Sequence, residues 1–289
     1  QNLVPSGVPV RLRISLPKVM MNKRKIKVSR LNYIKPEEVL IRFQDELNLI
    51  YLDSANHIIS EDNRYSYLAL DPIFSIKINR NEKYFNLQKF QKVKKIISEF
   101  KYKKIKSLPK FQCGLAGYIS YEAGLLKEKI ANVKLNENII PSIYFGLFDI
   151  VFAFDNKLKK AFIFSSNLDK EFKVETTHEI RLLKAKNLYA IPRINSIKDN
   201  VLGFKWVKDF TKKKYISKIS RILRYIKNGD VFQANFTQRF LSKIPDDFNE
   251  IHYYLHYRKK TETPFSCLIK NQDFNILSYS PERFLKLEK

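Results

Sequence analysis

The chain has 289 residues, of which 44% are apolar and 13% aromatic, and it carries a formal net charge of +25. This composition is typical of a globular protein of about two domains, and it excludes a disordered, collagen-like or membrane-spanning chain. With two cysteines, Cys113 and Cys267, the chain can build neither a disulfide framework nor a zinc site from cysteine alone, which favours reduced thiols in a cytoplasmic protein. Lysines are spread along the sequence rather than gathered in one patch, which favours a solvated basic surface over a nucleic-acid interface.

Residues 1–20 do not read like the start of a gene product. Position 1 is Gln, whereas Met20 and Met21 would be natural starts, and the stretch lacks the basic–apolar–small order of a signal peptide. We therefore expect residues 1–20 to be a disordered or non-native tail and leave them out of the fold.

Helical and extended patterns alternate from residue 33 onward. Pro36, followed by Glu37 and Glu38, predicts the start of a helix, because negative charge suits the first turn. Apolar runs bounded by turn residues predict strands over 49–52, 65–70, 74–78, 114–121, 142–154 and 160–164. Apolar residues at helical spacing predict helices over 85–100 and 178–190.

Residues 191–204 contain Pro192 and show little periodicity, so we interpret them as a linker between residues 21–190 and 205–289. The second region begins with a strong amphipathic helix that Gly229 terminates. It continues with a strand over 231–241, a helix over 249–258, a hairpin of 267–269 and 275–279, and a strand that begins at 284–287. Strands and helices in this mixed order favour an α+β fold with large antiparallel sheets packed with helices.

Four segments resemble the chorismate-utilising enzymes. Residues 225–240, YIKNGDVFQANFTQRF, match the pattern YI..GD.FQ.N.SQRF of that family. Residues 280–285 (SPERFL), 114–124 (GLAGYISYEAG) and 63–72 (NRYSYLALDP) match further segments in the family's order. A glycine-capped helix followed by a strand explains Gly229 and the apolar positions, but it does not require Gln233, Asn235, Gln238 and Arg239 together. The resemblance implies an N-terminal domain of the anthranilate synthase component I type over 21–190 and the start of a chorismate-binding catalytic domain over 205–289.

Two short segments point to one branch of this family. Residues 52–56 (LDSAN) and 263–268 (TPFSCL) look more like aminodeoxychorismate synthases, also called 4-aminobenzoate synthases, than like anthranilate synthases. The implied reaction joins chorismate with ammonia from a glutamine amidotransferase partner, and it uses Mg²⁺. Anthranilate synthase component I remains the alternative, and a non-catalytic fragment that binds tryptophan or a partner protein is the alternative of another class.

Glu282, in the segment SPERFL, matches the family's acid/base carboxylate. Such a group can protonate the leaving hydroxyl and accept a proton from ammonia. The alternative is a purely structural role, in which Glu282 ends a strand and pairs with Arg283. The family's lysine nucleophile and its magnesium-binding glutamates are expected beyond Lys289, so we expect this 289-residue chain to be a C-terminally truncated fragment that does not turn over chorismate by itself.

The resemblance also implies a pocket for tryptophan in the N-terminal domain. An aromatic slot with a few hydroxyl groups suits an indole. Asp53 stands where the family usually carries a longer glutamate that could meet the ligand's ammonium. The alternative is that these residues are ordinary core aromatics and turn serines. By motif position the pocket lining is Ser54, Tyr65, Ser66, Tyr67, Leu68, Pro264, Phe265 and Ser266.

Overall fold

The computed structural model describes residues 25–55, 63–79, 104–126, 140–169, 175–192 and 203–287, together with 91, 93–95, 98 and 172. Contacts between residues divide the chain into two compact units. The first unit comprises residues 1–196 and 254–289, and the second unit comprises residues 197–253.

The first unit is built around a seven-stranded sheet whose strands all pair antiparallel. The hairpin predicted near the end of the sequence is confirmed, and it joins this sheet because β11 pairs with β2, with Ser266 opposite Asp53. Residues from the end of the sequence therefore share one sheet with the N-terminal strands. The order across the sheet is β1 (Lys27–Leu31), β8 (Lys160–Ser165), β7 (Ile150–Asp155), β3 (Tyr65–Leu70), β2 (Leu49–Asp53), β11 (Phe265–Asn271) and β12 (Phe274–Ser280).

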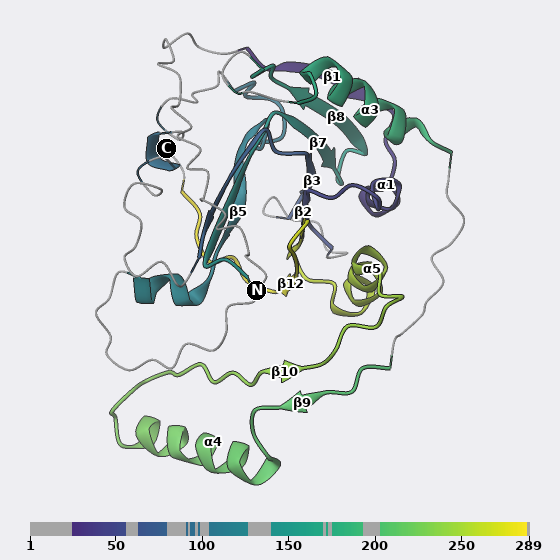
Figure 1. Cartoon of the computed structure of the whole chain (residues 1–289). Coiled ribbons are helices and arrows are strands. Elements are labelled where there is room, and N and C mark those ends of the chain that lie inside the picture. Colours follow the sequence, from purple (N-terminus) through teal and green to yellow (C-terminus); the bar gives the residue numbers. More distant parts are fainter. Residues whose placement is uncertain are drawn as a thin grey trace, which may run out of the picture. The chain divides into compact units, whose positions relative to one another are not determined.

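A three-stranded sheet packs on one face of the large sheet (Figure 1). It has the order β4 (Phe74–Ile78), β6 (Ile143–Phe148) and β5 (Gly114–Ile119), and the 3₁₀ helix η1 (Tyr121–Leu126) follows β5. A Cβ at Gly117 would lie 1.9 Å from the backbone oxygen of Tyr144, so close strand packing explains a glycine in this motif. The core between the sheets contains Ile50, Ala69, Ala116, Tyr144, Phe148, Val151, Ile269 and Phe274.

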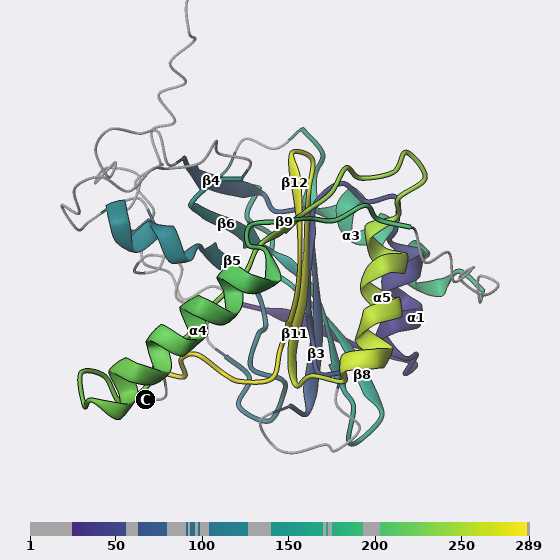
Figure 2. The ribbon, with the colours of Figure 1, turned by 90° about the horizontal axis from the view of Figure 1, so that it is seen from below.

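Helices cover the opposite face of the large sheet (Figure 2). They are α1 (Pro36–Arg42), α3 (His178–Ala190) and the part of α5 (Glu250–Thr261) that belongs to the first unit. The ring of Phe152 on β7 lies 5.6 Å from Phe43, next to α1, and stacks at 5.2 Å on Tyr189 of α3. Helices, large sheet and small sheet thus form three layers around two apolar interfaces.

The second unit contains α4 (Lys212–Lys227) and the two-residue strands β9 (Val207–Lys208) and β10 (Phe240–Leu241). The predicted helix end is confirmed, since Asn228 caps α4 and Gly229 has a φ of +83°. Two residues of the 225–240 motif tie β10 to the segment before α4, because Gln238 donates to the Phe210 carbonyl and Arg239 pairs with Asp209.

Three strand predictions are wrong. Of the strand predicted over 231–241, residues 231–239 are not a strand, because β9 pairs only with Phe240 and Leu241 at its end. No strand begins at 284–287, which follow Pro281, a residue that cannot donate to a sheet ladder. Residues 142–154 form two strands that are separated at Asp149, whose buried carboxylate is engaged by side chains of α3.

One strand was not predicted from the sequence, and one predicted helix lies mostly outside the described residues. The polar strand β1 was not predicted, because its five residues are mostly exposed and lack an apolar alternation. Most of the helix predicted over 85–100 falls outside the described residues, although 91, 93–95 and 98 are helical. Within the described part of the chain, no helix combines the length and apolar character needed to cross a bilayer.

Candidate functional site

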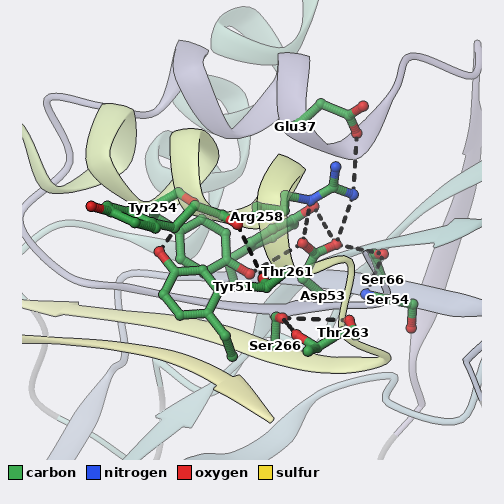
Figure 3. Close-up of polar contacts among 12 residues, drawn as sticks. Glu37, Tyr51, Asp53, Ser54, Ser66, Tyr254, Arg258, Thr261, Thr263 and Ser266 are labelled. Carbon is green, nitrogen blue, oxygen red and sulfur yellow. Dashed lines mark hydrogen bonds and ion pairs between the residues drawn. The ribbon is translucent and has the colours of Figure 1, made fainter. Parts of the chain in front are cut away.

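A buried carboxylate organises the end of β2. Asp53 is the last residue of this strand, and its side chain is fully buried. It lies in one row with Ser266 of β11 and Ser66 of β3, because the three residues occupy facing positions on adjacent strands. Ser66 donates a hydrogen bond to Asp53 Oδ1 at 3.3 Å, and the Tyr51 hydroxyl donates to the same oxygen at 2.9 Å (Figure 3).

Helix α5 supplies the positive charge that balances Asp53. Arg258 donates from Nε to Oδ2 and from an η nitrogen to Oδ1, and Tyr254 donates its hydroxyl to Oδ2 at 3.1 Å. Glu37, on α1, lies 3.7 Å from Arg258 on the outer side of the network (Figure 3). Burial raises the pKa of the Tyr51 and Tyr254 hydroxyls well above their ordinary value, so both keep the protons that they donate.

The three predicted serines gather around this network. The Ser54 amide donates to Ser66 Oγ at 3.3 Å, and Ser54 Oγ donates to the Tyr65 carbonyl at 2.8 Å. Ser266 shares a hydrogen bond with the Thr263 hydroxyl and is only 3% exposed. The hydroxyl groups of Ser54 and Ser66 therefore connect the ends of β2 and β3, and that of Ser266 fixes the segment before β11.

The remaining predicted pocket residues are divided between the faces of the sheet. Tyr65 and Tyr67 alternate along β3 with Ser66 and Leu68, so the two pairs face opposite sides. Tyr67 packs its ring 5.8 Å from Phe111 on the side of the small sheet. Burial raises the pKa of its hydroxyl to about 12.

Leu68 is completely buried. Pro264 and Phe265 are half-buried at the start of β11, and the Arg283 guanidinium lies 4.7 Å above the Phe265 ring. Thus the structure brings Ser54, Ser66 and Ser266 together, whereas Leu68 contributes to the core.

The structure also places residues that the sequence analysis did not single out. Tyr254 and Arg258 are four residues apart on α5, a spacing that puts both side chains on the same helix face toward Asp53. The four-residue spacing could have been recognised in the sequence, but it does not predict that Asp53 is the residue that this helix face contacts. Because Asp53 accepts hydrogen bonds from four side chains, a ligand ammonium would have to displace one of them to reach it.

Glu282 lies apart from this network. It follows β12 and is exposed, and its backbone amide and carbonyl contact the Ser280 hydroxyl. Its carboxylate makes no ion pair with any residue that the structure describes.

The family resemblance implies Mg²⁺, an ion that prefers several oxygen ligands in one place. No three Asp, Glu, His or Cys side chains among them are grouped as a metal-ligand set. The described part of the chain therefore does not fit a magnesium site.

Comparison with known proteins identifies the family. The model of the chorismate binding enzymes matches residues 50–289. Aminodeoxychorismate synthase component 1 of Bacillus subtilis is 24% identical over 249 residues, which are 78% of this chain and 50% of that protein. Anthranilate synthase component 1 of Saccharomyces cerevisiae is 26% identical over 239 residues, which are 78% of this chain and 46% of that protein.

A solved structure supports the same fold. Anthranilate synthase component I from Streptococcus pneumoniae matches with a TM-score of 0.56 and 22% identity, over 78% of this chain and 52% of that chain. The chain thus spans about half the length of the relatives that it matches. It belongs to the chorismate binding enzyme family, and the predicted α+β fold with large antiparallel sheets is confirmed.

Proposed function

We propose that this protein acts as component I of an aminodeoxychorismate synthase. It converts chorismate and ammonia into 4-amino-4-deoxychorismate, for the synthesis of 4-aminobenzoate and folate, and a glutamine amidotransferase partner provides the ammonia. The family match over residues 50–289 supports chorismate as the substrate. The similarity to the Bacillus subtilis protein supports the reaction and, through its name as a component, the partner.

The proposal of an aminodeoxychorismate synthase rather than an anthranilate synthase rests on two sequence segments that lie next to each other in the structure. LDSAN and TPFSCL, which resemble aminodeoxychorismate synthases, lie far apart in the sequence, but β2 and β11 bring them side by side at the Asp53–Ser266 pair. Both segments therefore contribute to the same hydroxyl-lined site around Asp53.

Glu282 has the proposed role of acid and base. Its protonated form gives a proton to the departing ring hydroxyl, and the resulting carboxylate takes a proton from the incoming ammonia. The position after β12 leaves this side chain exposed and free of ion pairs within the described residues.

A second candidate function has its own support. The Saccharomyces cerevisiae anthranilate synthase component is as similar to this chain as the aminodeoxychorismate synthase component. In that case ammonia adds at the ortho position, the ring hydroxyl leaves as water and the enolpyruvyl group leaves as pyruvate, so the product is anthranilate.

Product analysis separates the two candidates. The full product of the gene is incubated with chorismate, Mg²⁺ and ammonium, and the products are resolved by liquid chromatography. We expect 4-amino-4-deoxychorismate, and we expect Glu282→Gln to lower the rate by about 10²–10⁴-fold, the usual contribution of a positioned acid/base. Anthranilate as the product would favour the second candidate, and a wild-type rate in Glu282→Gln would remove Glu282 from the mechanism.

The predicted tryptophan-type pocket is a further part of the proposal. Ser54 follows β2, and Ser66 and Ser266 lie on the face of the sheet that carries Asp53, whereas Tyr65 and Phe265 alternate with them along β3 and β11 and lie on the other face. Titration calorimetry with tryptophan tests this assignment. We expect Ser54→Ala and Tyr65→Ala to weaken binding, whereas an absence of heat with the wild-type protein would leave these residues as structural ones.

A further inference from the structure

A cavity of about 270 Å³ lies in the first unit. Its lining residues lie at β1, around the end of β8 and at the start of α3, three elements that are labelled in Figure 1. None of its lining residues belongs to the network around Asp53, so it is a separate concavity. Most of its walls are polar or charged. The lining residues are Lys25, Lys27, Ser165, Ser166, Asn167, His178, Glu179 and Leu182.

Three nearly buried polar side chains line this cavity. The exposed fractions are 5% for Ser165, 3% for Ser166 and 5% for His178. Among the residues that the structure describes, the two serine hydroxyl groups and His178 Nε2 have no hydrogen-bond partner. None of these three atoms is among the fully buried unpartnered atoms of the described residues, so they remain open to water in the cavity, and a ligand there can replace that water as their partner.

The imidazole of His178 is held in one orientation. Its Nδ1 lies 2.8 Å from Asp149 Oδ2, which leaves Nε2 as the nitrogen available to the cavity. Arg181 donates two hydrogen bonds to the same carboxylate, at 2.9 and 2.7 Å. Arg181 also lies 3.7 Å from Asp169 Oδ1, so its charge is shared between two carboxylates, and the positive charge that attracts an anion comes from Lys25 and Lys27.

The start of α3 adds further donors. This helix has 13 residues, and the Thr177 side chain makes no capping hydrogen bond. The His178 amide donates to Asp169, which leaves the Glu179 and Ile180 amides of the first turn for another acceptor. Lys25 and Lys27 add positive charge at the exposed side of the cavity. Two carboxylates oppose an anion: Glu179 is exposed, and Asp169 accepts a hydrogen bond from the His178 amide at 2.6 Å.

We propose that this cavity binds a small oxyanion, the phosphate or carboxylate group of a metabolite, through the hydroxyls of Ser165 and Ser166, His178 Nε2 and the first turn of α3. Lys25 and Lys27 contribute attraction from the rim, and Glu179 limits the affinity. The site does not depend on the reaction proposed above.

Histidine side-chain NMR provides the test, because the chain contains four histidines and gives few imidazole signals. The 289-residue protein is titrated with inorganic phosphate and, separately, with acetate. We expect a saturable shift of the His178 signal, which is assigned by its loss in His178→Gln. The anion that acts at the lower concentration identifies the group recognised, and the absence of a saturable His178 shift with both anions would overturn the proposal.

Four variants distinguish specific binding of an anion in the cavity from nonspecific attraction of anions to a basic protein. We expect Ser166→Ala to weaken binding about tenfold, as for one lost hydrogen bond to a charged group. The exposed charges have smaller effects, so Lys27→Gln weakens and Glu179→Gln strengthens binding about threefold. Lys186→Gln, on α3 but outside the cavity lining, is the matched charge control and leaves the affinity unchanged.

Two results would contradict this assignment. One is an equal loss of affinity in Lys186→Gln and Lys27→Gln, which would mean that phosphate only senses the net charge. The other is an unchanged affinity in Glu179→Gln, an exposed substitution that leaves the fold intact, because a carboxylate at the rim must repel a bound anion.

Discussion

The large sheet of the first unit and helix α4 of the second unit both carry apolar residues at regular spacing, but only the sheet buries them. Leu68 and Phe152 are 0% exposed, whereas α4 contains no buried residue and Leu223 is 59% exposed. The spacing tells which face of an element is apolar, and burial requires a second layer against that face. In the first unit the helices and the small sheet provide such layers on both sides.

The two units differ in the same way in their ion pairs. Asp53 and Arg258 form a pair whose side chains are 0% and 15% exposed, in the first unit. Asp209 and Arg239 form a pair whose side chains are 32% and 49% exposed, in the second unit. An ion pair in water contributes little to stability, whereas a buried charge that loses its partner is strongly unfavourable.

The largest expected effect follows from this contrast. Arg258→Ala leaves the Asp53 carboxylate buried without its cation, so we expect it to lower the free energy of unfolding by roughly 3–5 kcal/mol. Arg239→Ala, the matched change in the second unit, lowers it by at most about 1 kcal/mol. Urea unfolding followed by circular dichroism measures both values. Equal losses in the two variants would contradict the distinction between the pairs.

The apolar contrast gives the next largest effect. Leu68→Ala opens a cavity in a filled layer, and we expect a loss of roughly 2–4 kcal/mol in the free energy of unfolding. Leu223→Ala removes a side chain from the exposed surface of α4 and changes it by less than about 0.5 kcal/mol. The same urea titrations test this pair. A loss above 2 kcal/mol in Leu223→Ala would show that another layer covers α4.

We expect low pH to destabilise the first unit, in part because Asp155 becomes protonated. Burial alone would raise the pKa of this carboxyl, but hydrogen bonds from Arg64 and from the amides of Leu158 and Lys157 outweigh it and lower the pKa. The folded state therefore holds the proton more weakly than the unfolded state. The stabilisation is complete above the ordinary pKa, near about 4, and is lost as the pH falls through the lowered value.

Asp155→Asn tests this pH dependence. The variant loses about 1–2 kcal/mol at neutral pH, as expected for a hydrogen-bonded ion pair, and it shows a smaller further loss between pH 4 and pH 2 than the wild type. Melting temperatures across that range provide the measurement. Parallel curves for the two proteins would mean that other carboxyls cause the acid sensitivity.

Local pattern was sufficient for much of the fold. Continuous or alternating apolar runs predicted β2, β3, β4 and the β11–β12 hairpin, because a strand with a buried face carries that pattern in its own sequence. The capping residue Gly229 predicted the end of α4 for the same reason. The prediction over 231–241 was wrong because a strand also needs a neighbour to pair with, which the segment's own residues do not encode.

The candidate site was only partly predictable. Motif positions predicted Ser54, Ser66 and Ser266, which the sheet register gathers at Asp53. Arg258 lies 205 residues from Asp53 in the sequence, and their pairing depends on how α5 packs on the sheet. An arginine in a helix rich in charged residues resembles a solvated one, so sequence pattern alone could not identify it as the partner of a buried carboxylate.

The smallest expected effect tests whether α4 responds independently of the sheet. Thr211 Oγ1 accepts a hydrogen bond of 3.3 Å from the Lys214 amide at the start of this helix. Thr211→Ala leaves that amide without its cap and lowers the local stability of α4 by about 0.5–1 kcal/mol, whereas Thr211→Ser retains the oxygen and serves as the control. Amide hydrogen exchange measures the effect residue by residue.

We expect the first-turn amides of α4 to exchange about two to five times faster in Thr211→Ala, a ratio that corresponds to the same free energy. The amides of β3 should keep their exchange rates, because this mostly buried strand belongs to the other compact unit. Faster exchange in β3 would show that the cap stabilises both units together. In that case the exposed apolar stripe of α4 would not be energetically separate from the sheet, and the contrast between the two regions would have to be abandoned.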